Sequence, residues 1–186
     1  MLKLDTIFIE ILKKISNYET KKKYIENLYV KNLKNKFASE SPCFVAGTKV
    51  LTKTGYKNIE DIEVGEEVLT HKNRYRKVLR IGNTKNQEIW ELISLDNSKF
   101  LATSNHPFLV SHIEETHYSD YKVKELKDIT YDDFLIGFNL DGVRNYSRVI
   151  SKSNLKYKDI VYNIEVEEDH TYIVQDKCVH NCQSLS

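Results

Sequence analysis

The fold is decided by residues 43–56, CFVAGTKVLTKTGY, a run rich in β-branched residues that ends at the turn signal Thr54-Gly55. Residues 49–52 within it have the composition of a short strand. Similar runs, separated by turn signals such as Gly65, Gly82-Asn83 and Asp96-Asn97, predict further strands at 67–70, 77–81, 89–95, 108–110, 161–166 and 171–174. Many short strands with few helical stretches predict an all-β domain.

Two segments of this β-rich region share a pattern. Residues 59–70 read IEDIEVGEEVLT, and residues 126–137 read LKDITYDDFLIG. The matched positions are Asp61 with Asp128, Ile62 with Ile129, Glu66 with Asp133, and Val68-Leu69 with Leu135-Ile136. This weak internal repeat fits a domain built from two related halves.

The composition changes near residue 42. Residues 1–42 contain nine Lys, five acidic residues and no Gly, and their apolar residues recur at helical spacing. We expect one or two amphipathic helices there, broken around residues 16–20, with the lysines on a solvated face.

Bulk composition excludes several classes of protein. The net charge of +1 argues against a nucleic-acid or membrane surface as the main partner, and no stretch has the roughly 18 apolar residues of a membrane span. Three Cys residues form no disulfide framework. We therefore expect a monomer in a reducing compartment, the cytoplasm.

Three short motifs carry chemistry that acts on the chain itself. The Cys43 thiol lies a few bonds from the Pro42 carbonyl, so its attack through a five-membered ring would convert that amide into a thioester. His106, in the tetrad 103–106 (TSNH), has a side chain suited to giving and taking protons at neutral pH. Asn181, between His180 and Cys182, can attack its own carbonyl through its side-chain nitrogen and form a succinimide.

Cys at the start, TxxH in the middle and HN followed by Cys at the end together resemble an intein, over Cys43 to Asn181. The resemblance implies the Hint fold of inteins and hedgehog-type domains, a horseshoe-like all-β fold with two pseudo-symmetric halves. It also implies splicing: an N–S acyl shift at Cys43, transthioesterification to Cys182, cyclisation of Asn181 and ligation of the flanks. Residues 1–42 and 182–186 would be those flanks, and thus the substrate.

The resemblance also assigns roles. His106 would protonate the departing amide nitrogen, and Thr103 would hydrogen-bond the first scissile bond, with Asn105 in support. His180 would polarise the Asn181 carbonyl, and His170, in the block VYNIEVEEDHTY (161–172), would assist cyclisation. No cofactor or metal is required, and each molecule reacts once, as an autocatalyst and not as a turnover enzyme.

The sequence leaves alternatives open. Asn163 stands where many splicing inteins carry an Asp, and bacterial intein-like domains resemble this block more closely, so one alternative is cleavage at one or both ends without ligation. Another is an inactive β-rich interaction module. Cys178 is expected to be a structural thiol, with a redox trap as a minor hypothesis. The stretch 135–142 is expected to be a turn, and there is no room for a homing endonuclease.

Overall fold

The computed structural model describes residues 42–112 and 121–181. The helical segment expected at residues 1–42 lies outside the described residues, apart from Pro42. None of the helices within the described ranges has the length and apolar character needed to cross a membrane.

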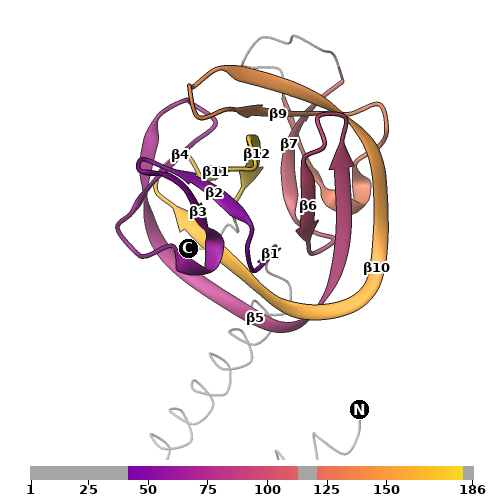
Figure 1. Ribbon diagram of the computed structural model, residues 1–186, viewed down its shortest axis with the longest axis horizontal. Helices are drawn as coiled ribbons and strands as arrows, with labels where there is room; N and C mark the ends of the chain where they lie inside the picture. The colour runs from indigo at the N-terminus through magenta and orange to yellow at the C-terminus, as the bar shows by residue number, and fades with distance from the viewer. Residues whose placement is uncertain (1–41, 113–120, 182–186) are drawn as a thin grey trace, which may run out of the picture. The chain divides into compact units, whose positions relative to one another are not determined.

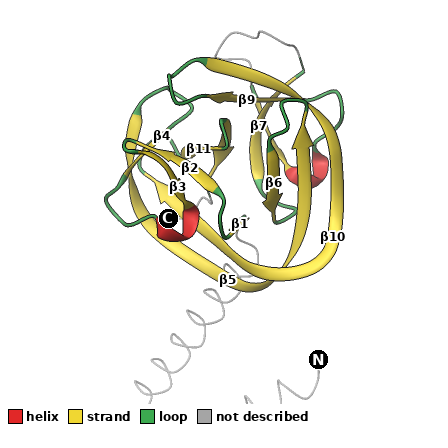
Figure 2. Ribbon diagram, viewed as in Figure 1, coloured by secondary structure: helices red, strands yellow, loops and turns green. Residues whose placement is uncertain are grey.

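The described residues form twelve strands and two short 3₁₀ helices, with no α-helix. Figure 2 shows how strongly strands dominate the domain. The all-β prediction is therefore confirmed. The strands are β1 (Phe44–Val45), β2 (Lys49–Thr52), β3 (Gly55–Asn58), β4 (Glu67–Leu69), β5 (Tyr75–Ser94), β6 (Lys99–Ala102), β7 (Pro107–Ser111), β8 (Lys122–Glu125), β9 (Phe134–Phe138), β10 (Arg144–Val166), β11 (Thr171–Val174) and β12 (Lys177–His180); the 3₁₀ helices are η1 (Ile59–Asp61) and η2 (Leu126–Asp128).

Two long strands, β5 and β10, give the domain its shape. They pair antiparallel from Ser94↔Val149 to Val78↔Val166, with several β-bulges that bend the ribbon. In Figure 1 this ribbon curves around the outside, and the short strands lie within the arc. Strands from opposite ends of the domain meet inside it, because β1 pairs with both β6 and β10, and β11 pairs with β2.

The two halves repeat one local structure, as the sequence repeat predicts. Each 3₁₀ helix buries its first residue, Ile59 in η1 and Leu126 in η2. Each is followed by a turn closed by a carboxylate, whose oxygen accepts the N–H three residues earlier: Glu66 from Glu63 and Asp133 from Thr130. The carboxylates also pair with a lysine of the preceding strand, Lys57 in β3 and Lys124 in β8.

Some expectations from the sequence are wrong. Gly82-Asn83 is not a turn, because it pairs with residues 162–163 of β10, so the strands expected at 77–81 and 89–95 are one strand, β5. Within 135–142, residues 135–138 belong to β9 and only 139–142 turn. In both places long-range pairing overrides the local glycine signal.

Gly137 allows a close approach between two backbones. A Cβ at this position would lie 1.7 Å from the carbonyl oxygen of Asp176 and 2.6 Å from the Cα of Lys177. Backbone atoms cannot move aside as a flexible side chain can, so Gly137→Ala is expected to lower the free energy of unfolding by about 3 kcal/mol. Urea denaturation measures this. Gly82→Ala is the control, since its Cβ would meet nothing within 4 Å; equal losses in both variants would contradict the prediction.

Candidate functional site

The amide that joins Pro42 to Cys43 is held by a buried threonine. The N–H of Cys43 donates to Oγ1 of Thr103 at 3.0 Å, and the N–H of Thr103 donates to the Cys43 carbonyl at 3.0 Å. Cys43 is 1% exposed and immediately precedes β1, which is fixed between β6 and β10. Thr103 is thus hydrogen-bonded to the Cys43 nitrogen, which would be the leaving group if the Cys43 thiol attacked the Pro42 carbonyl.

His106 is completely buried beside this bond. Its ring packs on Phe44, with 4.0 Å between centroids, and edge-on against Phe108. Neither ring nitrogen makes a well-aligned hydrogen bond to the described residues. Burial and, to a smaller extent, nearby His180 lower the pKa of His106 to about 3, and the carbonyl of Pro42 only partly opposes them. His106 is therefore neutral at rest and lies near the carbonyl that Cys43 would attack.

This burial predicts how stability depends on pH. The pKa of His106 is about 3 in the fold and 6.5 when the group is free, so below pH 6.5 the unfolded chain binds more protons. Stability is thus complete above pH 6.5 and falls as the pH drops toward 3, by about 2 kcal/mol from His106 alone at pH 5. Burial also lowers the pKa of His71, to about 4, and adds to the loss.

Urea unfolding of the protein at pH 7 and at pH 5 measures this loss. His106→Gln removes the titrating group while keeping a polar side chain of similar length. The variant is expected to lose less stability between the two pH values, by about 2 kcal/mol. An identical pH dependence in the variant and the parent chain would rule out His106 as the cause.

At the other end of the domain, Asn181 is 1% exposed and makes two hydrogen bonds to a single carbonyl oxygen. Its backbone N–H donates to the His170 oxygen at 2.8 Å. With the side-chain amide oriented so that both of its polar atoms find partners, its nitrogen donates to the same oxygen at 2.7 Å. The side-chain oxygen accepts the N–H of Val166 at 2.8 Å. These contacts hold the amide that would form the succinimide.

The ring of His180 is hydrogen-bonded to the backbone carbonyl of Asn181, which the Asn181 side-chain amide would attack. Its Nδ1 is 2.8 Å from the Asn181 oxygen, and since an oxygen can only accept, Nδ1 carries the proton. β12 pairs with β11, which places His180 opposite Thr171. The ring of His170 stacks on that of His180 with 6.3 Å between centroids. His180 also lowers the pKa of His106, so the two ends of the domain converge.

Comparison with known proteins shows what this arrangement resembles. A protein-family model, the Hint domain, matches residues 42–115. The crystal structure of the gp41-1 intein matches with a TM-score of 0.62 and 19% identity, covering 76% of this chain and 100% of that one. The bacterial intein-like domain from Clostridium thermocellum matches with a TM-score of 0.60 and 27% identity, covering 75% and 98%. The chain contains a Hint domain.

Two further matches place this Hint domain among its relatives. A DnaB intein from Synechocystis sp. PCC 6803 matches with a TM-score of 0.64 and 16% identity, covering 76% of this chain and 99% of that one. The uncharacterised protein MJ0043 of Methanocaldococcus jannaschii is 35% identical over 69 residues. That segment is 35% of this chain but only 8% of the relative.

Of the remaining predicted site residues, Asn105 and Asn163 belong to the part of the chain that the structure describes. Asn105 is half-buried in the turn between Thr103 and His106. Asn163 lies in β10 opposite Gly82, and its Oδ1 is buried with no hydrogen-bond partner in the described part of the chain. Cys182 lies outside the described residues.

Cys178 is placed apart from this chemistry. It is 1% exposed and packs with Leu51, Leu109, Phe138 and Ile173, and burial raises the pKa of its thiol. Cys43 belongs to a different apolar cluster. A thiol with a raised pKa forms little thiolate, so this environment favours the structural role.

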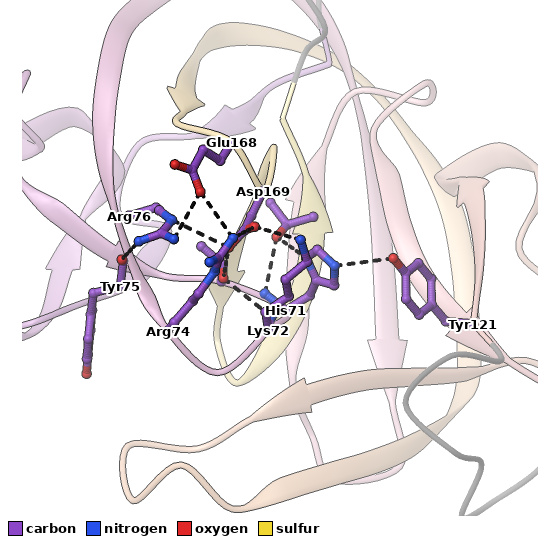
Figure 3. Close-up of polar contacts among 10 residues, drawn as sticks. His71, Lys72, Arg74, Tyr75, Arg76, Tyr121, Glu168 and Asp169 are labelled. Atoms are coloured by element: carbon purple, nitrogen blue, oxygen red, sulfur yellow. Dashed lines mark hydrogen bonds and ion pairs between the residues drawn. The ribbon is translucent and has the colours of Figure 1, made fainter.

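Sequence reasoning missed a charged cluster beside the C-terminal end of the Hint domain. The turn at residues 70–76 packs on the turn at 167–171, and the buried Asp169 lies at the centre of the contact, as Figure 3 shows. A signal was present: KNRYR at 72–76 is basic, and EVEED at 165–169 is acidic. Opposite charges so far apart in sequence indicate a contact only once the strands that carry them are paired.

Proposed function

We propose that this Hint domain is an autoprocessing element that breaks the peptide bonds at both its ends and joins its flanking segments. One observation carries the proposal: each end holds a nucleophile together with a group on the bond to be broken. At the first end Thr103 binds the Cys43 amide, and at the second His180 binds the Asn181 carbonyl. A fold alone would not require either pairing.

The first step is an acyl shift at Cys43. Its Sγ attacks the Pro42 carbonyl carbon, the C–N bond breaks, and the Pro42 acyl group becomes a thioester on Cys43 with a free amine. The thiol proton passes to the departing nitrogen, and neutral His106 can accept and return it. The hydrogen bond from the Cys43 N–H to Thr103 orients that nitrogen for protonation.

The second and third steps join the flanks. The Cys182 thiol attacks the thioester, so the upstream segment moves to Cys182 and the Cys43 thiol is released. The Asn181 side-chain nitrogen then attacks its own carbonyl carbon, a succinimide forms, and the amine of Cys182 leaves. His180 stabilises the charge that develops on the Asn181 oxygen. An S-to-N shift finally gives a Pro42–Cys182 peptide bond.

A second candidate is cleavage without ligation, and Asn163 is the observation that favours it. Its buried Oδ1 accepts no hydrogen bond from the described residues, and an amide cannot take the proton of an attacking thiol as a carboxylate can. Thioester formation and Asn181 cyclisation do not need such a group. An inactive interaction module would instead remain one intact species.

Intact mass spectrometry of the full chain over hours, with and without a thiol, tests the proposal. Splicing gives residues 1–42 joined to 182–186, beside the excised domain 43–181. Separate terminal fragments indicate cleavage only, and an unchanged mass indicates an inactive module. Cys43→Ala is expected to abolish ligation while Asn181 cyclisation persists; ligated product from this variant would refute the assignment of Cys43.

The conditions of the reaction form part of the proposal. The substrate is the protein's own flanking segments, with no nucleic acid, membrane or cofactor involved, and the protein acts as a monomer. Because Cys43 must be a free thiol, the reaction belongs in a reducing compartment such as the cytoplasm. Each molecule reacts once.

A further inference from the structure

The turn that presents the His170 carbonyl has an unfavourable backbone. Glu168 and His170 both have positive φ, 53° and 51°, although neither is glycine. Such conformations are sparsely populated and persist only where the surrounding structure enforces them. Yet the oxygen of His170 accepts both the backbone and the side-chain N–H of Asn181. Something must therefore hold this turn in place.

The carboxylate of Asp169, the residue between Glu168 and His170, fixes the turn. Its side chain is fully buried, and it accepts hydrogen bonds from Oγ1 of Thr70 and from Nε of Arg74, both at 2.8 Å. The ammonium of Lys72 lies 3.0 Å away. In Figure 3 the side chains of Lys72 and Arg74 reach Asp169 from the neighbouring turn. All of these partners come from residues 70–74, so the connection between β4 and β5 holds the turn in place.

The same connection also grips the residue after His170. The backbone N–H of His71 donates to Oγ1 of Thr171 at 3.1 Å, and Nδ1 of His71 lies 2.6 Å from the same oxygen. His170 is thus flanked by two residues that are fixed to residues 70–74. Only its carbonyl and its exposed ring are left to act on the C-terminal end.

We infer that Asp169 is a positioning residue for the Asn181 cyclisation, acting through the His170 carbonyl. A hydrogen bond from the attacking nitrogen to His170 fixes its direction, while Val166 fixes the oxygen of the same amide. Rotation of the Glu167–His170 turn would move the acceptor and misalign the nitrogen from its own carbonyl carbon. The inference rests on the proposed function, of which it deepens the C-terminal step.

The anchoring of the turn depends on the negative charge of Asp169 as well as on the volume of its side chain. The Arg74 guanidinium and Lys72 hold the pKa of this carboxyl well below its usual range despite burial, so it is ionised wherever the protein is folded. Asn would keep the volume and one acceptor oxygen but would lose the charge-assisted bonds to both cations. The turn would then be free to leave its unfavourable conformation.

The test compares Asp169→Asn with a matched control, Asp133→Asn. Asp133 is an equally buried carboxylate whose hydrogen-bond and ion-pair partners among the described residues are Thr130, His112 and Lys124, the last at 2.9 Å, and none of these belongs to the 167–171 turn. In the full chain carrying Cys43→Ala, release of residues 182–186 reports Asn181 cyclisation alone. Asp169→Asn is expected to slow this release roughly tenfold to a hundredfold, and Asp133→Asn to leave it within about twofold.

A second reaction separates positioning from general destabilisation. In chains carrying Asn181→Ala, thiol-induced release of residues 1–42 reports only the Cys43 step. Asp169→Asn should leave this rate unchanged; loss of both reactions together would show that the anchor is merely structural and would overturn the inference. Release of residues 182–186 from Asp169→Asn at the parent rate would overturn it too. Arg74→Gln, at a half-exposed residue, supplies a milder variant that should slow cyclisation in the same direction.

Hydrogen exchange keeps the inference testable even if the parent chain does not react. The Asn181 backbone N–H is protected by its bond to His170. Asp169→Asn is expected to speed its exchange at least about tenfold, while Asp133→Asn does not. A parent chain without either reaction would refute the proposed function, whereas unchanged exchange in Asp169→Asn would refute the anchor.

Discussion

Asn181→Ala is expected to leave residues 182–186 attached to the chain. The substitution removes the side-chain nitrogen that, in the proposed reaction, attacks the carbonyl of Asn181. Among the described residues, no other side-chain nitrogen is hydrogen-bonded to the His170 oxygen, which also accepts the Asn181 backbone N–H. An intramolecular attack owes its rate to a nucleophile already in place, so we expect release to fall by a factor of about a thousand or more. Intact mass over hours, in the presence of a reducing agent, measures the release.

Asn83→Ala is the control for this substitution. Asn83 is exposed in β5, and its backbone pairs with residue 162, so the amide itself has no part in the site. The variant should release residues 182–186 at the parent rate. Release from Asn181→Ala at the same bond would mean that a different group breaks it.

The second large effect is expected at the other end, from His106→Gln. Glutamine cannot shuttle the proton from the Cys43 thiol to the departing amide, so thiol-induced release of residues 1–42 should slow by roughly a hundredfold to ten-thousandfold. Glutamine is preferred to alanine, because His106 packs on Phe44 and a cavity there would confuse the result. The rate is followed by intact mass after addition of a thiol.

His112→Gln is the matched control, since the His112 side chain is half-exposed and pairs with the buried Asp133 instead of facing the Cys43 amide. The pH profile adds a separate check. Because burial holds the pKa of His106 at about 3, its titration should produce no inflection in the Cys43 step near pH 6.5. If His106→Gln formed the thioester at the parent rate, the proton would have to travel by another group.

Local sequence patterns predicted the short strands well, because alternation and turn residues act within a few positions. Residues 49–52 and 171–174 are strands with the predicted bounds. The long arms of β5 and β10 were not predictable in this way. Glycine at position 82 locally predicts the end of a strand. Gly82 nevertheless continues β5, because its backbone pairs with Asn163 of β10.

The residues of the candidate site also differ in whether local sequence could predict them. Cys43, His106 and Asn181 were predicted as site residues because the proposed chemistry needs particular residue types at particular places in the sequence. The contact between Asp169 and Arg74 was not predicted, since it forms only where two turns meet in space. A buried carboxylate has no local signature that separates it from a solvated one.

The pairing of β1 with β10, and of β2 with β11, ties the start of the domain to its last-made part. A ribosome completes residues 161–181 only at the end of the domain's synthesis. Until then Phe44 has no Tyr162 to pair with, and His180 cannot approach His106. Under the proposed function, we therefore expect the upstream segment to stay attached until residues 161–181 have been synthesised, so that cutting begins only once the whole Hint domain has been made.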